Sequence, residues 1–240
     1  MYLIKLGGSV ITIKSRYRTF RWKATTKILD FISKLNENVI LVHGGGSFGH
    51  IMAKKYGIPG VMTEERKEGF SIVHMDMLEL NSRICRLTQE FIGPCVSIPP
   101  AIAFENMEKT ISNYLNNGVI PVLFGDSLIR GDMAEIISGD EIMYRIARGY
   151  SPDKVVFITD VDGVYTSNPK VDPDARLLKV LSGQVQTSLT YTDVTGGMGG
   201  KIEVMKKIAD LGSRVYVVNG RRPERLLSLG KEEFVGTVIE

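Results

Sequence analysis

The chain has 240 residues, 43% of them hydrophobic, and its 30 basic and 27 acidic residues give a formal net charge of +3. This length and apolar content exclude a disordered or fibrous protein and fit one large α/β domain or two closely joined lobes. A charge this small and scattered excludes nucleic acid as the main partner.

Apolar runs of strand length alternate with helical patterns, which is typical of a mainly parallel sheet covered by helices. The predicted strands are Tyr2 to Leu6, Val39 to His43, Cys95 to Ile98, Val119 to Phe124, Lys154 to Thr159 and Arg214 to Val218. The first strand follows Met1 with no basic leader, and no apolar run reaches the roughly 20 residues of a membrane span. We therefore expect a cytoplasmic protein with no membrane partner.

Four stretches have helical spacing, and the one after Ser138 carries Ile142 and Ile146. One carries apolar residues at i, i+3, i+4 and i+7, namely Ile28, Phe31, Ile32 and Leu35. A longer helix is predicted from about Glu64 to Phe91, and a late one carries Ile202, Met205 and Ala209 before a stop at Gly212. The best candidate for a domain boundary is Gly149 to Pro152. It could separate an acceptor-binding half from a nucleotide-binding half, or the sheet could continue across it.

Cys85 and Cys95 are the only cysteines. Their setting resembles neither a metal site nor a disulfide framework, so we expect two buried thiols in a reducing compartment.

The first strand delivers Lys5-Leu6-Gly7-Gly8-Ser9 to the carboxyl edge of the predicted sheet, where open α/β sheets bind ligands. An ordinary strand-to-helix turn could have the same residues. Lys14 is either a ligand contact or a solvated loop lysine.

The second strand runs into His43-Gly44-Gly45-Gly46-Ser47-Phe48-Gly49-His50. Three glycines let the backbone approach a ligand closely, and successive N–H groups can converge on an anion, which predicts a phosphate cradle. Gly44-x-Gly46-x-x-Gly49 also matches the dinucleotide fingerprint of nicotinamide and flavin enzymes. The segment Tyr56 to Gly60 breaks the long helix that this fingerprint requires, so the oxidoreductase alternative is disfavoured.

Three later motifs complete the set. In Ser138-Gly139-Asp140-Glu141 the serine fits a helix cap, and Asp140 is available to organise lysines. Thr159 to Tyr165 follows an apolar strand and is also compatible with a plain Asp- and Gly-rich turn. In Thr195-Gly196-Gly197-Met198-Gly199-Gly200-Lys201 a lysine stands in the first turn of a helix, where the helix dipole disfavours a cation unless an anion is bound.

In this order, the five motifs resemble the amino acid kinase family over essentially the whole chain. The resemblance implies a three-layer αβα sandwich with a mainly parallel central sheet, in one domain of residues 1–240. An N-terminal lobe of about 1–150 would bind the phosphate acceptor, and a C-terminal lobe of about 151–240 would bind ATP. The family resemblance also suggests a homodimer.

Within the family, Lys14 together with Ser47-Phe48-Gly49-His50 is most similar to the archaeal isopentenyl phosphate kinases. This similarity implies transfer of the ATP γ-phosphoryl group to isopentenyl phosphate in the alternate mevalonate route of isoprenoid biosynthesis. Mg²⁺ would bridge the ATP oxygens.

The resemblance also assigns residues on the donor side. Lys5, Lys14 and Lys201 would contact the donor phosphates, and Asp140 would hold lysines in place through charge-assisted hydrogen bonds. The other ATP-binding residues would be Gly7, Gly8, Ser9, Gly46, Asp160, Gly163, Tyr165 and Gly196. No residue is assigned as a metal ligand.

On the acceptor side, His50 would bind the substrate phosphate with Gly45, Gly46, Gly49 and Gly139. A phosphate monoester has a second pKa of about 6, so the acceptor is already an anion near neutrality and needs no general base. His43 and His74 are expected to be structural. Phe70, Val73 and Met77 share a helical face and would form one wall of a pocket for the apolar tail, unless they are ordinary core.

Two alternatives remain open. One is a kinase similar to the fosfomycin kinases, acting on another phosphate or phosphonate. The other is a non-catalytic nucleotide- or oxyanion-binding module, which is disfavoured because Lys5, Lys14, Asp140 and Lys201 are all present.

Overall fold

The computed structural model describes residues 1–182 and 199–240, with only the backbone of residues 101–105. An eight-stranded sheet in the order β11-β13-β12-β8-β1-β2-β5-β4 crosses the molecule. Its strands are β1 (Tyr2–Leu6), β2 (Val39–His43), β4 (Cys95–Ile98), β5 (Ile120–Phe124), β8 (Lys154–Thr159), β11 (Val180–Leu181), β12 (Arg214–Asn219) and β13 (Thr237–Ile239). The six predicted strands are confirmed to within one residue at each end, and they pair in parallel with one another.

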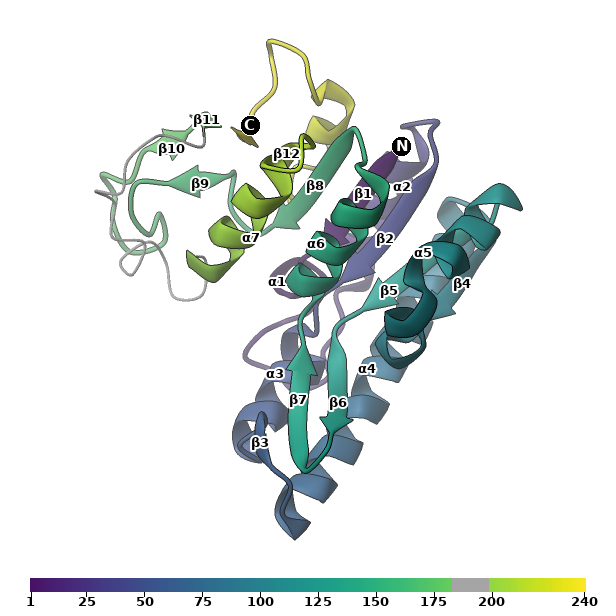
Figure 1. Ribbon diagram of the computed structural model, residues 1–240. Helices are drawn as coiled ribbons and strands as arrows, with labels where there is room; N and C mark the ends of the chain where they lie inside the picture. The colour runs from purple at the N-terminus through teal and green to yellow at the C-terminus, as the bar shows by residue number, and fades with distance from the viewer. Residues whose placement is uncertain (183–198) are drawn as a thin grey trace.

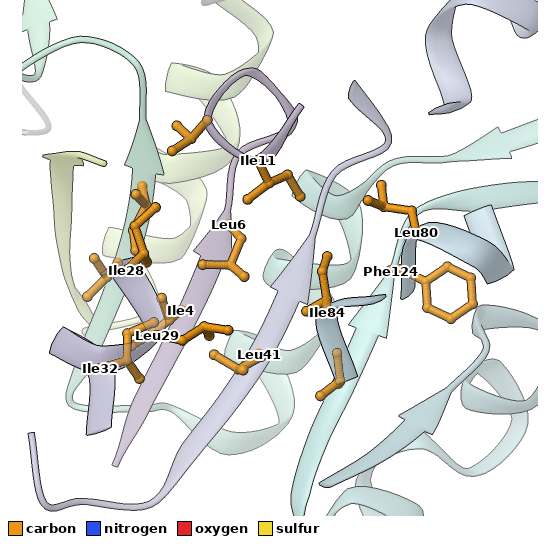
Figure 2. Close-up of a cluster of buried hydrophobic side chains, with 14 of the residues drawn as sticks. Ile4, Leu6, Ile11, Ile28, Leu29, Ile32, Leu41, Leu80, Ile84 and Phe124 are labelled. Atoms are coloured by element: carbon orange, nitrogen blue, oxygen red, sulfur yellow. The ribbon is translucent and has the colours of Figure 1, made fainter. Parts of the chain in front are cut away.

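Helices cover both faces of this sheet, so the predicted three-layer arrangement is confirmed (Figure 1). One face packs against α2 (Trp22–Ser33) and α4 (Glu64–Phe91), and the other against α5 (Pro100–Asn116), α6 (Gly139–Tyr150) and α7 (Gly199–Ala209). Figure 2 shows the first of these layers, where the predicted apolar stripe of α2 lies on Ile4 and Leu6 of β1. No helix within the described residues combines the length and apolar character that crossing a bilayer requires.

Shorter elements connect these layers. Two short helices, α1 (Gly8–Ile11) and α3 (Gly46–Lys55), follow β1 and β2. Beside α4 lies a small sheet of β3 (Gly60–Val61), β7 (Met133–Ile137) and β6 (Asp126–Arg130). The remaining elements are β9 (Val164–Tyr165), β10 (Leu177–Leu178) and the 3₁₀ helix η1 (Pro223–Ser228).

The central sheet continues across the joint at Gly149 to Pro152. After α6 the chain enters β8, which pairs with β1 along its length. Strands of the N-terminal and C-terminal parts of the chain therefore lie side by side.

Five parallel strands end in register at one edge of the sheet. At this edge a glycine that follows each of four strands donates its N–H to a carbonyl near the end of the neighbouring strand. These bonds join Gly7 to Ile158 (2.9 Å), Gly44 to Leu6 (3.1 Å), Gly125 to His43 (3.2 Å) and Gly220 to Thr159 (2.8 Å). The register of the sheet therefore brings distant glycine loops into one row.

The two cysteines lie closer together than their sequence positions suggest. Both are free and only partly buried, and Cys95 Sγ lies 3.2 Å from the carbonyl oxygen of Cys85. The expectation of two buried thiols is wrong, because Cys85 on α4 and Cys95 at the start of β4 lie near the open edge of the sheet and are only partly buried.

Candidate functional site

A cavity of about 140 Å³ opens at the edge where the parallel strands end. Its polar lining comes from the glycine loops and from α6 and α7: Lys5, Gly7, Gly8, Gly44, Gly45, Gly49, His50, Gly125, Asp126, Ser138, Gly139, Asp140 and Lys201. Its apolar lining is Ala53, Val73, Met77, Ile136 and Ile137. A larger hollow of about 500 Å³ between α5 and α6 contains none of the glycine loops, so we place the functional site at the smaller cavity.

Lys5 and Asp140 form an ion pair in this cavity. Lys5 is only 6% exposed, and its Nζ lies 2.5 Å from Asp140 Oδ1. Burial lowers the pKa of Lys5 to about 8 against the opposing effect of Asp140, and the nearby Lys201 lowers it further. Asp140 is fixed in the first turn of α6, where the helix dipole favours a carboxylate. Ser138 caps this helix by accepting the N–H of Glu141 at 3.1 Å, as its sequence position predicts.

The first glycine loop, which follows β1 and contains Gly7 and Gly8, is in direct contact with the second, which follows β2 and contains Gly44 to Gly46. A Cβ on Gly8 would lie 2.4 Å from the backbone nitrogen of Gly46, and a Cβ on Gly44 would lie 3.2 Å from that of Gly8. Gly46 also has a φ of +51°, a conformation that strongly favours glycine. Gly46 starts α3, which ends at Lys55, as the predicted break after it requires. Backbone N–H groups of both loops can therefore approach one ligand closely.

The triple-glycine loop rests against α4. A Cβ on Gly45 or Gly49 would come within 3.1 or 3.2 Å of Met77 Sδ. The methionine thus lines the cavity and supports the cradle at once. The predicted acceptor glycines Gly45, Gly49 and Gly139 all line the cavity, and Gly46 is buried directly behind them.

His50 stands on α3 at the mouth of the cavity and remains accessible to solvent. Neighbouring protein atoms displace enough water to lower the pKa of His50, and the charges of Lys201, Lys14 and Lys5 lower it further, opposed by Asp140. The imidazole is therefore neutral near pH 7 and can donate one hydrogen bond to an anion.

The other two histidines have partners inside the fold. His43 is fully buried, stacks on Phe124 with ring centroids 5.5 Å apart, and lies 3.2 Å from Asn81 Oδ1 through Nε2. His74 Nδ1 lies 2.7 Å from Asp126 Oδ2. Asp126 itself lines the cavity, so His74 holds a wall residue in place.

Lys14 lies outside the cavity lining, on the exposed loop between α1 and α2. Partial burial lowers the pKa of Lys14, and Lys201 lowers it further, against Asp160. These influences place Lys14 in the electrostatic field of the lysine in the first turn of α7. Lys14 in turn helps to lower the pKa of Asp160.

Asp160 is held by residues from two sides. Ser9 Oγ donates to Asp160 Oδ1 at 2.9 Å, and Lys170 forms an ion pair with Oδ2. Burial alone would raise the pKa of Asp160, but the hydrogen bonds from Lys170 and Ser9 outweigh it and lower the pKa. The predicted nucleotide residues Ser9 and Asp160 thus lie together beside the first glycine loop.

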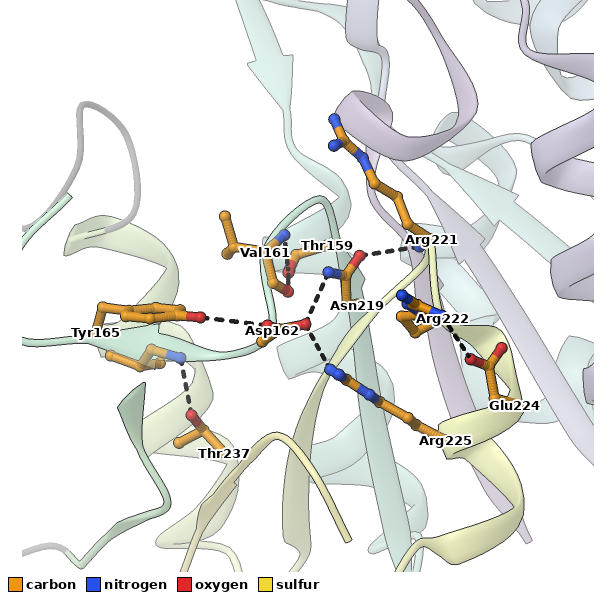
Figure 3. Close-up of polar contacts among 11 residues, drawn as sticks. Thr159, Val161, Asp162, Tyr165, Asn219, Arg221, Arg222, Glu224, Arg225 and Thr237 are labelled. Atoms are coloured by element: carbon orange, nitrogen blue, oxygen red, sulfur yellow. Dashed lines mark hydrogen bonds and ion pairs between the residues drawn. The ribbon is translucent and has the colours of Figure 1, made fainter. Parts of the chain in front are cut away.

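The turn after β8 is organised by Asp162 (Figure 3). Its carboxylate accepts from Asn219 Nδ2 at 2.9 Å and from the Tyr165 hydroxyl at 3.4 Å, and it pairs with Arg225. A Cβ on Gly163 would lie 2.3 Å from Thr237 Oγ1, which also accepts the N–H of Val164 at 2.8 Å. The predicted residues Gly163 and Tyr165 are therefore fixed in place by the last two strands of the chain.

Sequence reasoning missed several residues of this region. Asn219 and Arg225 reach Asp162 only through the folded sheet, although Asn219-Gly220 at the end of a strand was a usable signal. Ala53, Ile136 and Ile137 line the apolar end of the cavity and belong to a short helix and a hairpin with no strong periodic signal. Gly196 lies outside the described residues.

The apolar wall differs in part from the prediction. Val73 and Met77 line the cavity, but Phe70 does not. Its ring stacks on His74, with centroids 6.2 Å apart and planes at 4°. Phe70 also packs against the hydrophobic core that contains Val73 and Met77.

The described residues hold no group of three or more His, Cys, Asp or Glu side chains that could bind a metal ion. Among the described residues, Lys5 and Lys201 line the cavity, and Lys14 and Lys170 bring positive charge to Asp160. Together with the glycine loops, this arrangement can bind phosphate groups and stabilise negative charge, and its apolar end can hold a short hydrocarbon.

Comparison with known proteins agrees with this chemistry. Residues 1–219 match the model of the amino acid kinase family. The chain is 41% identical to isopentenyl phosphate kinase of Thermoplasma acidophilum, with both chains fully covered, and 37% identical to that of Methanothermobacter thermautotrophicus, with 100% of this chain and 98% of the relative covered. A crystal structure of the T. acidophilum enzyme in a product complex superposes with a TM-score of 0.90 at 40% identity over the whole of both chains.

Proposed function

The chain belongs to the amino acid kinase family, and from this premise we propose that it transfers the γ-phosphoryl group of ATP to isopentenyl phosphate. The products are isopentenyl diphosphate and ADP. The reaction belongs to isoprenoid biosynthesis, in the alternate mevalonate route.

One observation carries this proposal: a single small cavity has a phosphate-binding end and an apolar end. The glycine loops, Lys5 and His50 form the first end. Ala53, Val73 and Met77 contribute to the second. An acceptor with an anionic head and a short hydrocarbon tail satisfies both ends, whereas an amino acid or nucleoside acceptor would leave polar groups against the apolar wall.

On the donor side, positively charged side chains and backbone N–H groups bind the phosphates of ATP. Phosphoryl transfer makes few covalent demands, so the protein aligns the groups and stabilises charge on the transferring phosphoryl. Lys5, Lys14 and Lys201 contact the donor phosphates, and Gly8 supplies an N–H. Asp140 holds Lys5 in place, since its carboxylate lies 2.5 Å from the ammonium group. When bound with ATP, Mg²⁺ neutralises charge on the phosphate oxygens and needs few or no protein ligands there.

On the acceptor side, His50 binds and orients the substrate phosphate. The acceptor is already largely anionic near pH 7, so no residue has to remove a proton from it. A neutral His50 with Gly45, Gly49 and Gly139 offers donors to that anion without adding another fixed positive charge. Phe70 supports this site from behind His74.

ATP occupies the C-terminal lobe of about 151–240, and the acceptor occupies the N-terminal lobe of about 1–150. Asp160, Gly163 and Tyr165 stand on the nucleotide side, where Asp162 and Arg225 stiffen the turn that carries them. Gly7, Ser9, Gly46 and Gly196 complete the ATP-binding set.

We also infer a cytoplasmic homodimer. Strand β4 ends the central sheet and has only β5 as a neighbour among the described strands, which leaves one sheet edge able to pair with a second copy. The two free thiols fit a reducing compartment. Light scattering on the purified protein measures its mass in solution. The mass of a monomer at micromolar concentration would contradict the inferred dimer.

The function is tested by ADP release with isopentenyl phosphate, dimethylallyl phosphate, fosfomycin, UMP and acetylglutamate as acceptors. We expect the kcat/KM for isopentenyl phosphate to be the highest among these five acceptors. A preference for the phosphonate would indicate a fosfomycin-kinase-like enzyme instead, and binding of ATP with no turnover of any acceptor would indicate a non-catalytic module.

A further inference from the structure

Thr12 lies behind the cavity and touches both glycine loops. Its side chain is fully buried, at 0% exposure. The hydroxyl Oγ1 donates to the carbonyl oxygen of Gly8 at 2.6 Å and accepts the N–H of Ser47 at 3.0 Å. One oxygen atom thus joins the loop after β1 to the loop after β2.

Only a hydroxyl can make this connection at this position. It must donate to one loop and accept from the other, and a methyl group of the same size can do neither. The space around it is also fixed, because a Cβ on Gly46 would lie 2.1 Å from Oγ1 and 2.9 Å from the Thr12 methyl carbon. The side chain therefore fills the gap between the loops as well as bonding them.

Under the proposed function, Gly7 and Gly8 of the loop after β1 stand on the donor side, and Gly45 of the loop after β2 stands on the acceptor side. Gly46, assigned to both ATP and the acceptor, lies against Gly8, where the two loops meet. Transfer requires the two phosphates to meet in line, and a misplacement of about 1 Å can cost on the order of 100-fold in rate. Thr12 is not among the residues that line the cavity, so it can act only through the loops.

We propose that Thr12 is a positioning residue that sets the separation of the donor and acceptor loops. This role rests on the proposed kinase function for the meaning of donor and acceptor. It predicts that losing the hydroxyl slows transfer while each substrate still binds its own loop.

The test compares Thr12→Val, which removes the hydroxyl at constant volume, with Thr12→Ser, which keeps it. Thr25→Val is the matched control. Thr25 is equally buried and also donates to a carbonyl four residues earlier, that of Arg21 at 3.0 Å, but this bond lies at the N-terminal end of α2. Steady-state kinetics give kcat and the KM of each substrate. If Thr12→Val does not fold, as judged by circular dichroism, Thr12→Ala replaces it.

We expect Thr12→Val to lower kcat by about 10- to 100-fold, with both KM values within about threefold of the wild type. Thr12→Ser and Thr25→Val should stay within about threefold of the wild-type kcat. Equal losses in Thr12→Val and Thr12→Ser, or in Thr12→Val and Thr25→Val, would overturn the proposal, as would a wild-type kcat in Thr12→Val.

A second measurement does not depend on turnover. Hydrogen exchange of the Ser47 amide, followed by NMR, should speed up at least tenfold in Thr12→Val and not in Thr25→Val, because that N–H loses its acceptor. An unchanged exchange rate would show that the Thr12 hydroxyl does not accept the Ser47 N–H, and would overturn the proposal. If the wild type turned over no acceptor, the proposed function would fail while this measurement still decided whether Thr12 joins the loops.

Discussion

Tyr17 donates a hydrogen bond to Asp76 at 2.6 Å, and this contact ties the loop that carries Lys14 to helix α4. Asp76 is 4% exposed, and Arg18 from the same loop lies 3.3 Å from its other oxygen. Asp76 also follows Val73 on the helix that lines the acceptor end of the cavity. The loop of a donor-side lysine therefore rests on the acceptor-side helix.

Removal of this contact should slow catalysis without unfolding the protein. Burial and the Asp76 hydrogen bond raise the pKa of Tyr17 to about 12, so the phenol stays protonated and the bond persists at working pH. A hydrogen bond to a charged group contributes about 1.5–3 kcal/mol, and we expect Tyr17→Phe to lower kcat by about 3- to 10-fold as Lys14 loosens. Initial rates at saturating ATP and acceptor measure this effect.

Tyr150→Phe is the control for that variant. Its hydroxyl lies 2.8 Å from Ser112 Oγ, between α5 and α6 and away from the cavity. A wild-type kcat in Tyr17→Phe, or an equal loss in both variants, would show that the contact does not position Lys14.

ATP binding should weaken above about pH 8. Burial lowers the pKa of Lys5 to about 8 in the ligand-free protein, so its ammonium group is lost as the pH rises through that value. Bound polyphosphate favours the charged lysine, and binding must then take up a proton. The Kd for ATP should rise by up to about tenfold per pH unit above pH 8, as measured by titration calorimetry.

In Lys5→Arg the Kd for ATP should no longer rise above pH 8, because a guanidinium group stays protonated over the whole pH range. Lys154→Arg, at the opposite end of the neighbouring strand β8, should keep the wild-type profile. If the Kd of the wild type for ATP did not change between pH 7 and pH 10, the result would contradict a buried Lys5 beside the ATP phosphates.

His50→Ala should affect the acceptor far more than the donor. We expect kcat/KM for isopentenyl phosphate to fall by about 100-fold, because a donor to the substrate phosphate is lost, while the Kd for ATP changes by less than about threefold. His50→Gln keeps an N–H donor and should recover part of the loss. Unchanged steady-state kinetics in His50→Ala would remove this histidine from the mechanism.

The two thiols should differ in reactivity. The contact between them, aided by burial, raises the pKa of Cys85, and the same contact lowers the pKa of Cys95 against its own burial. Because the thiolate is the reactive form, iodoacetamide at pH 8 should modify Cys95 first. Peptide mass spectrometry over time measures the order, and equal rates at both positions would contradict it.

Apolar runs and helical spacing predicted six of the eight strands of the central sheet and the helices α2, α4, α6 and α7, but not β11, β13 or α5. Val73 and Met77 were correctly placed on one face of α4, since a spacing of four residues keeps two side chains together on any helix. The hairpin of β6 and β7 was not predicted, because its alternation is interrupted by charged residues, and α3 was not, because it begins with Gly46-Ser47-Phe48-Gly49, a weak helix-forming sequence.

The site was harder to predict than the fold wherever it depends on contacts between distant segments. Their positions in the glycine-rich motifs, together with the family resemblance, singled out Lys5, His50 and Asp140, but only the register of β1, β2 and β8 shows how their loops meet. Phe70 shows the same limit on a smaller scale. Periodicity places Phe70 on the same helical face as Val73 and Met77, but it cannot show which residues of that face line a cavity and which stack on a histidine of the same helix.

The contact between Gly8 and Gly46 also limits how this protein can diverge. Neither position has room for a side chain, because an added Cβ would meet the backbone of the other loop or the Thr12 side chain. A change in one loop therefore has to be matched in the other, although they stand far apart in the chain. A chimaera that combined the two segments from distant relatives would therefore bring together two backbones that were never fitted to each other.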